Sequence, residues 1–322
     1  MKAVVADPLG GPENLKYLDF PTPQPGDGEV LVKIEAIGVN FIDIYFRTGL
    51  YKANESPVKL GSEAAGIIAA VGRGVQLKVG TRVAYAMARG SYAEYAAVPQ
   101  SSLVEVPEKV SFEDAAAVML QGMTAHYLTR STFALKPGDT CLVHAAAGGA
   151  GLLIVQMAKI AGATVIGTVS TEAKAELARG HGADHIILYT QTDFLPEVKR
   201  IVHDKGVDVV YDSVGSTTFH KSLDCLRPRG MMVSFGQSSG PVGQFDPLVL
   251  SQKGSLFLTR PSLANYVSDP NELKWRSSDI FNWIAAGRLK LQIHKMYPLA
   301  DAASAHRDLE ARKTSGKLLL KP

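Results

Sequence analysis

The sequence predicts an α/β protein with two domains, one a β-barrel and the other built on a doubly wound parallel sheet. The chain has 322 residues, which is more than one hydrophobic core usually serves. Its first third consists of short apolar or alternating runs separated by Gly and Pro, which is typical of antiparallel strands. From about Thr124 onward, continuous apolar strands alternate with helical segments, which indicates a parallel sheet covered on both faces.

The predicted barrel strands all precede Thr124. Each is a short apolar or alternating run, and the Pro- and Gly-rich segment Pro21–Gly28 is the clearest break between them. The strands are Ala3–Ala6, Glu29–Asn40, Ala64–Gly72 and Arg82–Ala86.

The predicted parallel sheet follows a strand–helix alternation. Its strands are apolar on both faces, as expected when helices cover both sides of a sheet. The expected strands are Asp139–Ala146, Ala163–Ser170, Asp184–Tyr189, Gly206–Gly215, Gly230–Gly236 and Gly254–Pro261. The expected helices are Leu152–Gly162, Thr171–Gly182, Asp193–Asp204 and Ser216–Leu226.

Composition excludes several classes of protein. Hydrophobic residues make up 46% of the chain and charged residues 20%, and the net charge of +3 includes no long basic block, so the composition disfavours a nucleic-acid partner. Cys141 and Cys225 are too few for a disulfide framework or a four-cysteine zinc site. The most apolar run, Ile67–Val71, is too short to span a membrane, and the N-terminus lacks the apolar core of a signal peptide. We therefore expect a cytoplasmic protein.

A Gly-rich turn follows the first parallel strand. Residues His144–Gly151 read HAAAGGAG and align Ala146, Gly148 and Gly151 with the G-x-G-x-x-G pattern. Gly148 allows the backbone to approach a pyrophosphate, and Gly151 allows the helix to pack closely on the strand. Because this turn opens a β-α-β-α-β series, it predicts a dinucleotide site on the backbone N–H groups, to which Gly149 and Leu152 of the same turn also belong.

The end of the second parallel strand distinguishes the two nicotinamide dinucleotides. An NAD site usually carries a carboxylate there, whereas this strand ends at Ser170. Lys174 and Tyr189 lie close enough in the expected fold to join Ser170 in holding a 2′-phosphate, although Lys174 is also explained as an ordinary surface lysine. Glu172 lies nearby but inside the following helix. The pattern favours NADPH over NADH.

Motifs along almost the whole chain resemble the medium-chain dehydrogenase/reductase superfamily, and within it the zinc-independent, zeta-crystallin-like NADPH:quinone oxidoreductases. They include GGPENL, VNFIDIYFRTGLY, GSEAAG, HAAAGGAGLLIVQMAK, VVYDSVG and GKLLL. The resemblance implies a GroES-like β-barrel catalytic domain formed by residues 1–124 and 262–322. It also implies a Rossmann domain formed by residues 125–261.

The resemblance also bears on metal binding. Zinc-dependent members carry Cys, His and Cys at positions that here are Asn40, Ser62 and Leu120. Asn and Ser are poor zinc ligands and Leu is none, so we expect no metal. Ser62 is not a nucleophile of the G-x-S-x-G type, because Leu60 and Ala64 replace the glycines.

The resemblance further implies a set of site residues in the cleft between the domains. It places Asn40, Thr124 and the backbone of Phe235, Gly236 and Ser238 around the nicotinamide, and Arg260 and Lys317 near the cofactor. Ser213 lies at the carboxyl end of an expected parallel strand, which is where such ligands bind. Tyr45, Tyr51 and the Asn40 amide are candidate donors to the reduced oxygen, while Asp43 is expected to organise the loop that carries them.

Three functions remain open at this point. The first is NADPH-dependent reduction of quinones by metal-free hydride or electron transfer. The second is reduction of α,β-unsaturated carbonyl compounds, and the third is a non-enzymatic NADPH-binding structural or RNA-binding role. The resemblance also implies a homodimer that pairs the strand at residues 254–261 with its copy.

Overall fold

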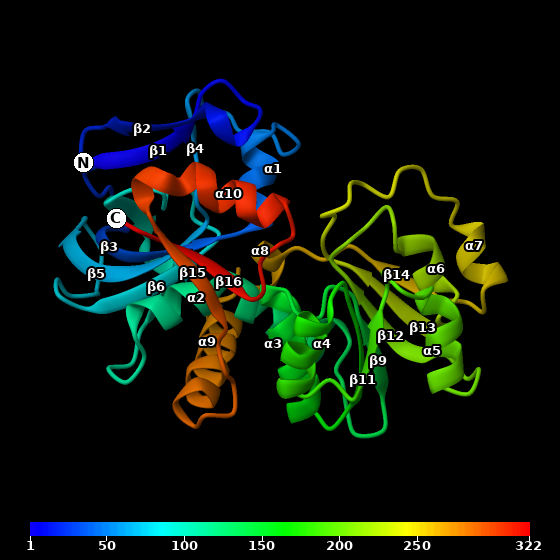
Figure 1. The fold of residues 1–322 in the computed structure, drawn as a ribbon. Helices are drawn as coiled ribbons and strands as arrows, with labels where there is room; N and C mark the ends of the chain where they lie inside the picture. The colour runs from blue at the N-terminus through cyan, green and yellow to red at the C-terminus, as the bar shows by residue number, and fades with distance from the viewer. The chain divides into compact units, whose positions relative to one another are not determined.

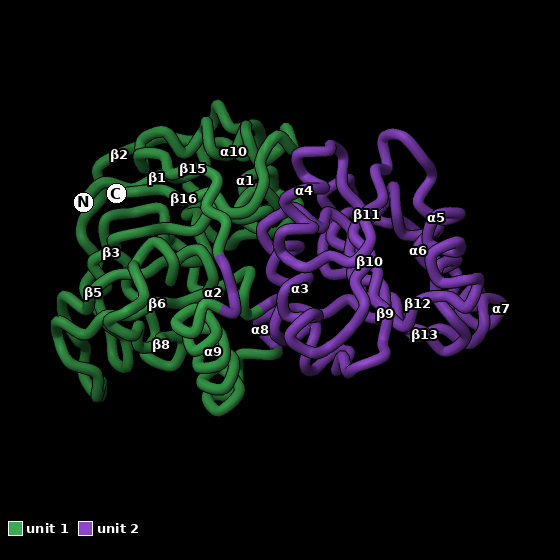
Figure 2. The backbone as a smooth tube through the Cα atoms, turned by 60° about the horizontal axis from the view of Figure 1, so that its bottom comes forward, with its two compact units in different colours: residues 1–123, 266–287, 291–322 green, residues 124–265, 288–290 purple.

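The computed structural model describes all 322 residues and divides the chain into two compact units (Figure 2). The first, which we call the barrel unit, consists of Met1–Met123, Tyr266–Gly287 and Leu291–Pro322. The second, the nucleotide unit, consists of Thr124–Asn265 and Arg288–Lys290.

Two sheets build the barrel unit (Figure 1). The larger is seven-stranded, with order β15-β16-β3-β5-β6-β8 and β7 paired to β3, and the smaller has the order β2-β1-β4. The larger sheet contains β3 (Glu29–Val39), β5 (Glu63–Val71), β6 (Arg82–Ala86), β7 (Tyr95–Pro99), β8 (Leu103–Glu105), β15 (Ile293–Pro298) and β16 (Lys317–Lys321). The smaller contains β1 (Lys2–Ala6), β2 (Leu15–Asp19) and β4 (Val58–Lys59).

Helices of the barrel unit come from three parts of the chain. They are α1 (Phe41–Arg47), α2 (Phe112–Tyr127), α9 (Pro270–Ala285) and α10 (Ala302–Glu310), with the short helical turns η1 (Pro12–Asn14), η2 (Gln100–Ser102) and η4 (Leu299–Asp301). The core is mainly aliphatic, with three buried tyrosines, and includes Val32, Ile34 and Ile68 on the buried faces of β3 and β5. Since burial of such side chains contributes about 1.5–3 kcal/mol each, this core fixes the strands that carry the site.

One strand pairing positions the site. The C-terminal strand β16 runs antiparallel to β3, with Leu318 opposite Val39 and Leu319 opposite Gly38 (Figure 1). Continuing this register by one residue brings Lys317 beside Asn40, although 277 residues separate them in sequence.

The nucleotide unit is a six-stranded parallel sheet of order β11-β10-β9-β12-β13-β14, the doubly wound order expected of a Rossmann domain. All six predicted strands are present, with shifted ends: β9 (Thr140–Val143), β10 (Thr164–Val169), β11 (His185–Leu188), β12 (Val207–Asp212), β13 (Leu226–Ser234) and β14 (Phe257–Thr259). The helical elements are η3 (Leu128–Thr132), α3 (Gly149–Ile160), α4 (Glu172–Gly180), α5 (Phe194–Ile201), α6 (Phe219–Leu223), α7 (Leu248–Gln252) and α8 (Leu263–Tyr266).

In addition, no helix in the chain combines the length and the apolarity needed to cross a bilayer.

The first prediction concerns Gly151 in α3. A Cβ atom at this position would lie 2.2 Å from the carbonyl oxygen of Ala145, which is backbone and cannot move aside cheaply. We expect Gly151→Ala to lower the free energy of unfolding of the nucleotide unit by about 1–3 kcal/mol, as overpacking usually does. Gly180→Ala, at the end of α4 with open space around it, is the matched control and should be neutral or slightly stabilising. Urea denaturation of the two variants measures this, and equal midpoints would contradict the packing argument.

Candidate functional site

Asn40 joins β3 to α1 and is held at its backbone by the next turn. Its N–H donates to Oδ2 of Asp43 over 2.9 Å, and the N–H of Asp43 donates back to its carbonyl over 3.1 Å. This reciprocal pair satisfies groups that would otherwise be unpaired at a helix start. The backbone of Asn40 is therefore fixed independently of its side chain.

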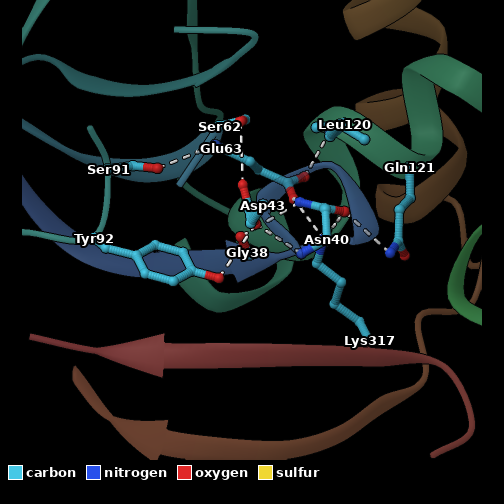
Figure 3. A network of polar contacts seen from close by, with 10 residues as sticks. All are labelled: Gly38, Asn40, Asp43, Ser62, Glu63, Ser91, Tyr92, Leu120, Gln121 and Lys317. Atoms are coloured by element: carbon cyan, nitrogen blue, oxygen red, sulfur yellow. Dashed lines mark hydrogen bonds and ion pairs between the residues drawn. The ribbon is translucent and has the colours of Figure 1, made fainter. Parts of the chain in front are cut away.

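The Asn40 side chain is 3% exposed and uses both ends of its amide (Figure 3). Its Oδ1 accepts from Lys317 Nζ at 2.8 Å and from Gln121 Nε2 at 3.2 Å. Its Nδ2 donates to Glu63 Oε2 at 2.8 Å and makes a much longer contact of 3.4 Å with the carbonyl of Gly38. One N–H of the amide is thus firmly bonded and the other only weakly.

Glu63 is the anionic partner of Lys317 and of the Asn40 amide. Its Oε2 lies 2.5 Å from Lys317 Nζ, and its Oε1 accepts from the backbone N–H of Leu120 in α2 at 2.5 Å. The side chains of Lys317 and Glu63 are only 4% and 0% exposed, so the ion pair is almost completely desolvated. Gly38 makes room for it, because a Cβ there would lie 2.0 Å from Glu63 Oε2.

A second chain of hydrogen bonds begins at Asp43. Ser62 Oγ donates to Oδ1 of Asp43, and Tyr92 OH donates to Oδ2, each over 3.2 Å. Tyr92 OH lies 2.9 Å from Nε2 of His306, whose Nδ1 lies 3.2 Å from Nη1 of Arg47. Arginine can only donate, so Nδ1 of His306 is the acceptor and Nε2 carries the proton toward Tyr92.

In this series of hydrogen bonds Arg47 donates to His306, His306 to Tyr92, and Tyr92 to the carboxylate of Asp43. Arg47 itself is anchored by Glu310, with N–O distances of 3.0 and 2.6 Å. Burial, with a smaller contribution from the charge of Arg47, lowers the pKa of His306 to about 3, so the imidazole is neutral. Burial raises the pKa of Asp43 to about 7 against the opposing effects of its hydrogen bonds and of Lys317. Burial and the nearby Asp43 also raise the pKa of Tyr92 well above its ordinary value.

The predicted donors Tyr45 and Tyr51 belong to an aromatic cluster next to this network. Their ring centroids lie 5.1 Å apart, and the rings of Phe41 and Phe46 pack at 6.3 Å from Tyr45 and 5.8 Å from Tyr51 respectively. The backbone N–H of Tyr51 donates to the carbonyl of Tyr45 over 3.0 Å. Both phenol side chains are half-buried in the segment that follows Asn40.

The Gly-rich turn of the nucleotide unit lies between β9 and α3. Gly148 precedes the first residue of α3, and its N–H donates to the carbonyl of Ala145 over 2.8 Å, while Ala146 N–H donates to the carbonyl of Thr168 over 3.1 Å. Leu152 N–H closes the first helical bond with Gly148 over 2.9 Å. The remaining N–H groups of this turn, including that of Gly149, lie at the end of a 12-residue helix, which is a favourable place for an anion.

Of the three residues predicted to hold a 2′-phosphate, Ser170 and Tyr189 lie together at the ends of β10 and β11. Val169 pairs with Leu188, which brings Ser170 and Tyr189 side by side, and the Ser170 carbonyl accepts from Thr190 Oγ1 over 2.9 Å. Lys174 lies in the first turn of α4. Glu172, which weakened the sequence-based preference for NADPH, is paired with Arg179 at 2.8 Å.

The remaining predicted cofactor residues of this unit gather at the ends of β12 and β13. Ser238 N–H donates to the carbonyl of Ser213 over 3.1 Å, and Phe235 N–H to that of Asp212 over 2.9 Å. Arg260 donates to the carbonyls of Ser234 and Gly236 over 2.8 and 3.2 Å, so its guanidinium braces this turn. Thr124 lies elsewhere, in α2, and is buried.

Comparisons with known proteins identify the family. Residues 26–108 match the alcohol dehydrogenase GroES-like domain, and residues 181–320 match the zinc-binding dehydrogenase family. A quinone oxidoreductase of Pseudomonas aeruginosa is 48% identical, with 97% of each chain covered. The chain belongs to the quinone oxidoreductase family.

Two other relatives of this chain differ in the substrate that their names state. The structure of Escherichia coli quinone oxidoreductase complexed with NADPH superposes with a TM-score of 0.98 at 45% identity, covering all of both chains. A 2-haloacrylate reductase of a Burkholderia species is 44% identical and is matched over 99% of this chain and 98% of its own. The predicted α/β fold, with a GroES-like and a Rossmann domain, and the predicted superfamily are confirmed.

One of the matching family models is described as zinc-binding, but the side chains at the corresponding positions of this chain do not fit zinc. The Asn40 oxygen already accepts from Lys317, the Ser62 hydroxyl donates to Asp43, and Leu120 contributes only its backbone N–H. The structure contains no group of three or more His, Cys, Asp or Glu side chains placed to hold a metal ion. Tetrahedral zinc requires thiolate, imidazole or carboxylate ligands, which these positions do not supply.

Sequence reasoning missed several members of the two networks. Gln121 and Tyr92 bond directly to the predicted residues Asn40 and Asp43, and His306 and Arg47 extend the second network beyond Tyr92, but none of the four carries a local sequence signal. Gln121 and His306 lie in helices that the sequence analysis did not predict, and Tyr92 follows an irregular segment.

The second prediction concerns the titration of Asp43. Because its folded-state pKa of about 7 exceeds the ordinary value of 3.8, the unfolded chain loses this proton first as the pH rises, and stability falls between about pH 4 and pH 7. We expect this loss to reach about 4 kcal/mol, since one pKa unit corresponds to about 1.4 kcal/mol. Asp43→Asn should remove this part of the pH dependence of urea unfolding, and the exposed Asp27→Asn should not. Parallel pH profiles for wild type and Asp43→Asn would contradict the assignment.

Proposed function

We propose that this chain catalyses the NADPH-dependent reduction of quinones. The observation that carries the proposal is the full-length similarity, at 48% identity, to a quinone oxidoreductase. The match to a relative whose structure was determined with NADPH supports the choice of cofactor. When bound, NADPH supplies the hydride from its nicotinamide ring.

In the nucleotide unit, the chain offers a site that fits the phosphates of NADPH. The turn that contains Gly148, Gly149 and Gly151 leaves no side chain between an anion and the N-terminus of α3, with Ala146 and Leu152 on either side. Ser170, Lys174 and Tyr189 bind the 2′-phosphate, and no carboxylate at the end of β10 repels it. The turns of Ser213 and of Phe235–Ser238, braced by Arg260, and Thr124 hold the nicotinamide end.

In the barrel unit, Asn40 and Lys317 serve the reacting end. The second N–H of Asn40 has only the 3.4 Å contact to Gly38, so it is free to strengthen a bond to an oxygen that gains negative charge. Asp43 holds the Asn40 backbone in place rather than touching substrate. Tyr45 and Tyr51 contribute their half-buried rings to a flat aromatic substrate and remain the candidate proton donors.

A second candidate function is reduction of an activated carbon–carbon double bond. It is favoured by the 44% identity to a 2-haloacrylate reductase, whose name describes such a substrate. The same hydride donor and the same oriented amide would serve both reactions, because each places negative charge on an oxygen conjugated with the reacting carbon or oxygen.

We also propose a homodimer in the cytoplasm. β14 is the edge strand of the nucleotide unit, and Phe257 and Leu258 on it are 56% and 37% exposed. An apolar edge of this kind is protected when it pairs with a second copy. Two unpaired buried cysteines, Cys141 and Cys225, suit a reducing compartment.

The third prediction tests the reaction. NADPH oxidation should be fast with 1,4-benzoquinone or 9,10-phenanthrenequinone and slower with 2-alkenals, 2-chloroacrylate and an enoyl-CoA, measured by loss of absorbance at equal acceptor concentrations. Turnover of 2-chloroacrylate or alkenals without turnover of any quinone would replace the first function by the second. Binding of NADPH without turnover of any acceptor would reject both.

The fourth prediction tests the 2′-phosphate site. Lys174→Met should raise the KM for NADPH about 10- to 100-fold, which corresponds to one charge-assisted hydrogen bond of about 1.5–3 kcal/mol. The KM for NADH should change little, because NADH lacks the phosphate. Lys199→Met, an exposed lysine on α5 of the same unit, is the control and should alter neither value. An equal loss for NADPH and NADH would mean that Lys174 does not contact the phosphate.

A further inference from the structure

The fold itself does not require the buried ion pair of Lys317 and Glu63. Desolvating two charges is expensive, and well-packed apolar side chains often replace such pairs without loss of stability. Lys317 occupies the first position of β16, where the next three residues are Leu318, Leu319 and Leu320. An apolar side chain would therefore suit the strand and the core around it.

The two charges have one clear effect, which is to distinguish the ends of the Asn40 amide. Oδ1 faces the Lys317 ammonium and the Gln121 amide nitrogen, while Nδ2 faces the Glu63 carboxylate and the Gly38 carbonyl. Rotating the amide by half a turn would set donor against donor at the ammonium and oxygen against oxygen at the carboxylate. In a desolvated site both contacts are strongly repulsive, so one orientation is enforced.

We propose that Lys317 and Glu63 are positioning residues that fix the orientation of the Asn40 amide, so that it presents an N–H and never a carbonyl oxygen to the substrate. This inference rests on the proposed function, in which the substrate oxygen gains negative charge. A flipped amide would direct its own oxygen toward that charge and oppose the reaction.

The surroundings predict what happens when both charges are removed. In Lys317→Met/Glu63→Gln, the oxygen of the introduced glutamine side chain keeps the bond from Leu120 N–H, so the nitrogen of that side chain faces Asn40. Asn40 then satisfies this nitrogen only by turning its own oxygen toward it. The Asn40 nitrogen now faces Gln121, whose Oε1 is buried and has no partner in the present structure, so a rotated Gln121 can accept from it. The neutral site is well bonded, but the Asn40 amide is reversed.

The experiment compares Lys317→Met, the double variant Lys317→Met/Glu63→Gln, and the control Lys321→Met. Lys321 lies on the same strand but is 48% exposed and pairs loosely with Glu113 at 3.7 Å. Lys317→Met strands a buried carboxylate and should lower both the melting temperature and kcat. The double variant should recover the wild-type melting temperature while kcat with quinone stays at least 10-fold low and the Kd for NADPH changes less than threefold. Lys321→Met should match wild type in all three.

A second measurement does not depend on turnover. The ¹H–¹⁵N signals of the Asn40 side-chain amide, assigned by their loss in Asn40→Ala, should shift in the double variant, because their acceptor changes from a carboxylate to a neutral amide. Recovery of kcat together with melting temperature would overturn the proposal, since the pair would then be only structural. A double variant that does not recover its melting temperature would also overturn it. If the wild-type protein oxidises NADPH with none of the acceptors tested, the proposed function is rejected instead, and the amide signals still report the orientation.

Discussion

An ammonium group buried inside the barrel unit is the constraint on which the site depends. Lys317 enters the core because β16 pairs with β3, and its charge requires a carboxylate within hydrogen-bonding distance. Glu63 meets this requirement only because Gly38 leaves space for it and because α2 offers the N–H of Leu120 to its second oxygen. The strand register, the glycine and the position of α2 are therefore linked through one ion pair.

A second network fixes the same residue from another direction. Asp43 binds the backbone N–H of Asn40, and Tyr92, His306 and Arg47 continue the chain of bonds as far as α10. At its far end the series of hydrogen bonds stops at Arg47, a guanidinium that donates to His306 and does not release a proton. It is a rigid support, and together the two networks determine both the backbone and the side-chain orientation of Asn40. Such support is what a site needs when its catalysis consists mainly of positioning.

The sequence predicted the parts of the molecule that depend on local pattern. The parallel strands are continuous apolar runs, and the turn at Gly148 has a backbone requirement that only small residues meet, so both were recognisable. Asn40, Ser62 and Leu120 were recognised through resemblance. The partners of Asn40 were not predicted as a group, because Lys317 reaches it through a strand pairing across 277 residues and Gln121 through a helix whose alanine-rich sequence shows no clear apolar face. The register of β16 on β3 and the direction of an amide are tertiary properties.

The buried lysine also indicates how this chain differs chemically from zinc-dependent members of its superfamily. A metal ion can take a substrate oxygen as an additional ligand and so withdraw charge from it directly. The Lys317 ammonium is held between Glu63 and Asn40, and its charge is largely compensated by the carboxylate 2.5 Å away. The ammonium therefore acts through the orientation of a neutral amide. An amide N–H stabilises negative charge on a substrate oxygen less strongly than a metal ion does. Such a site suits acceptors that are already electron-poor, and quinones and activated alkenes are both of this kind.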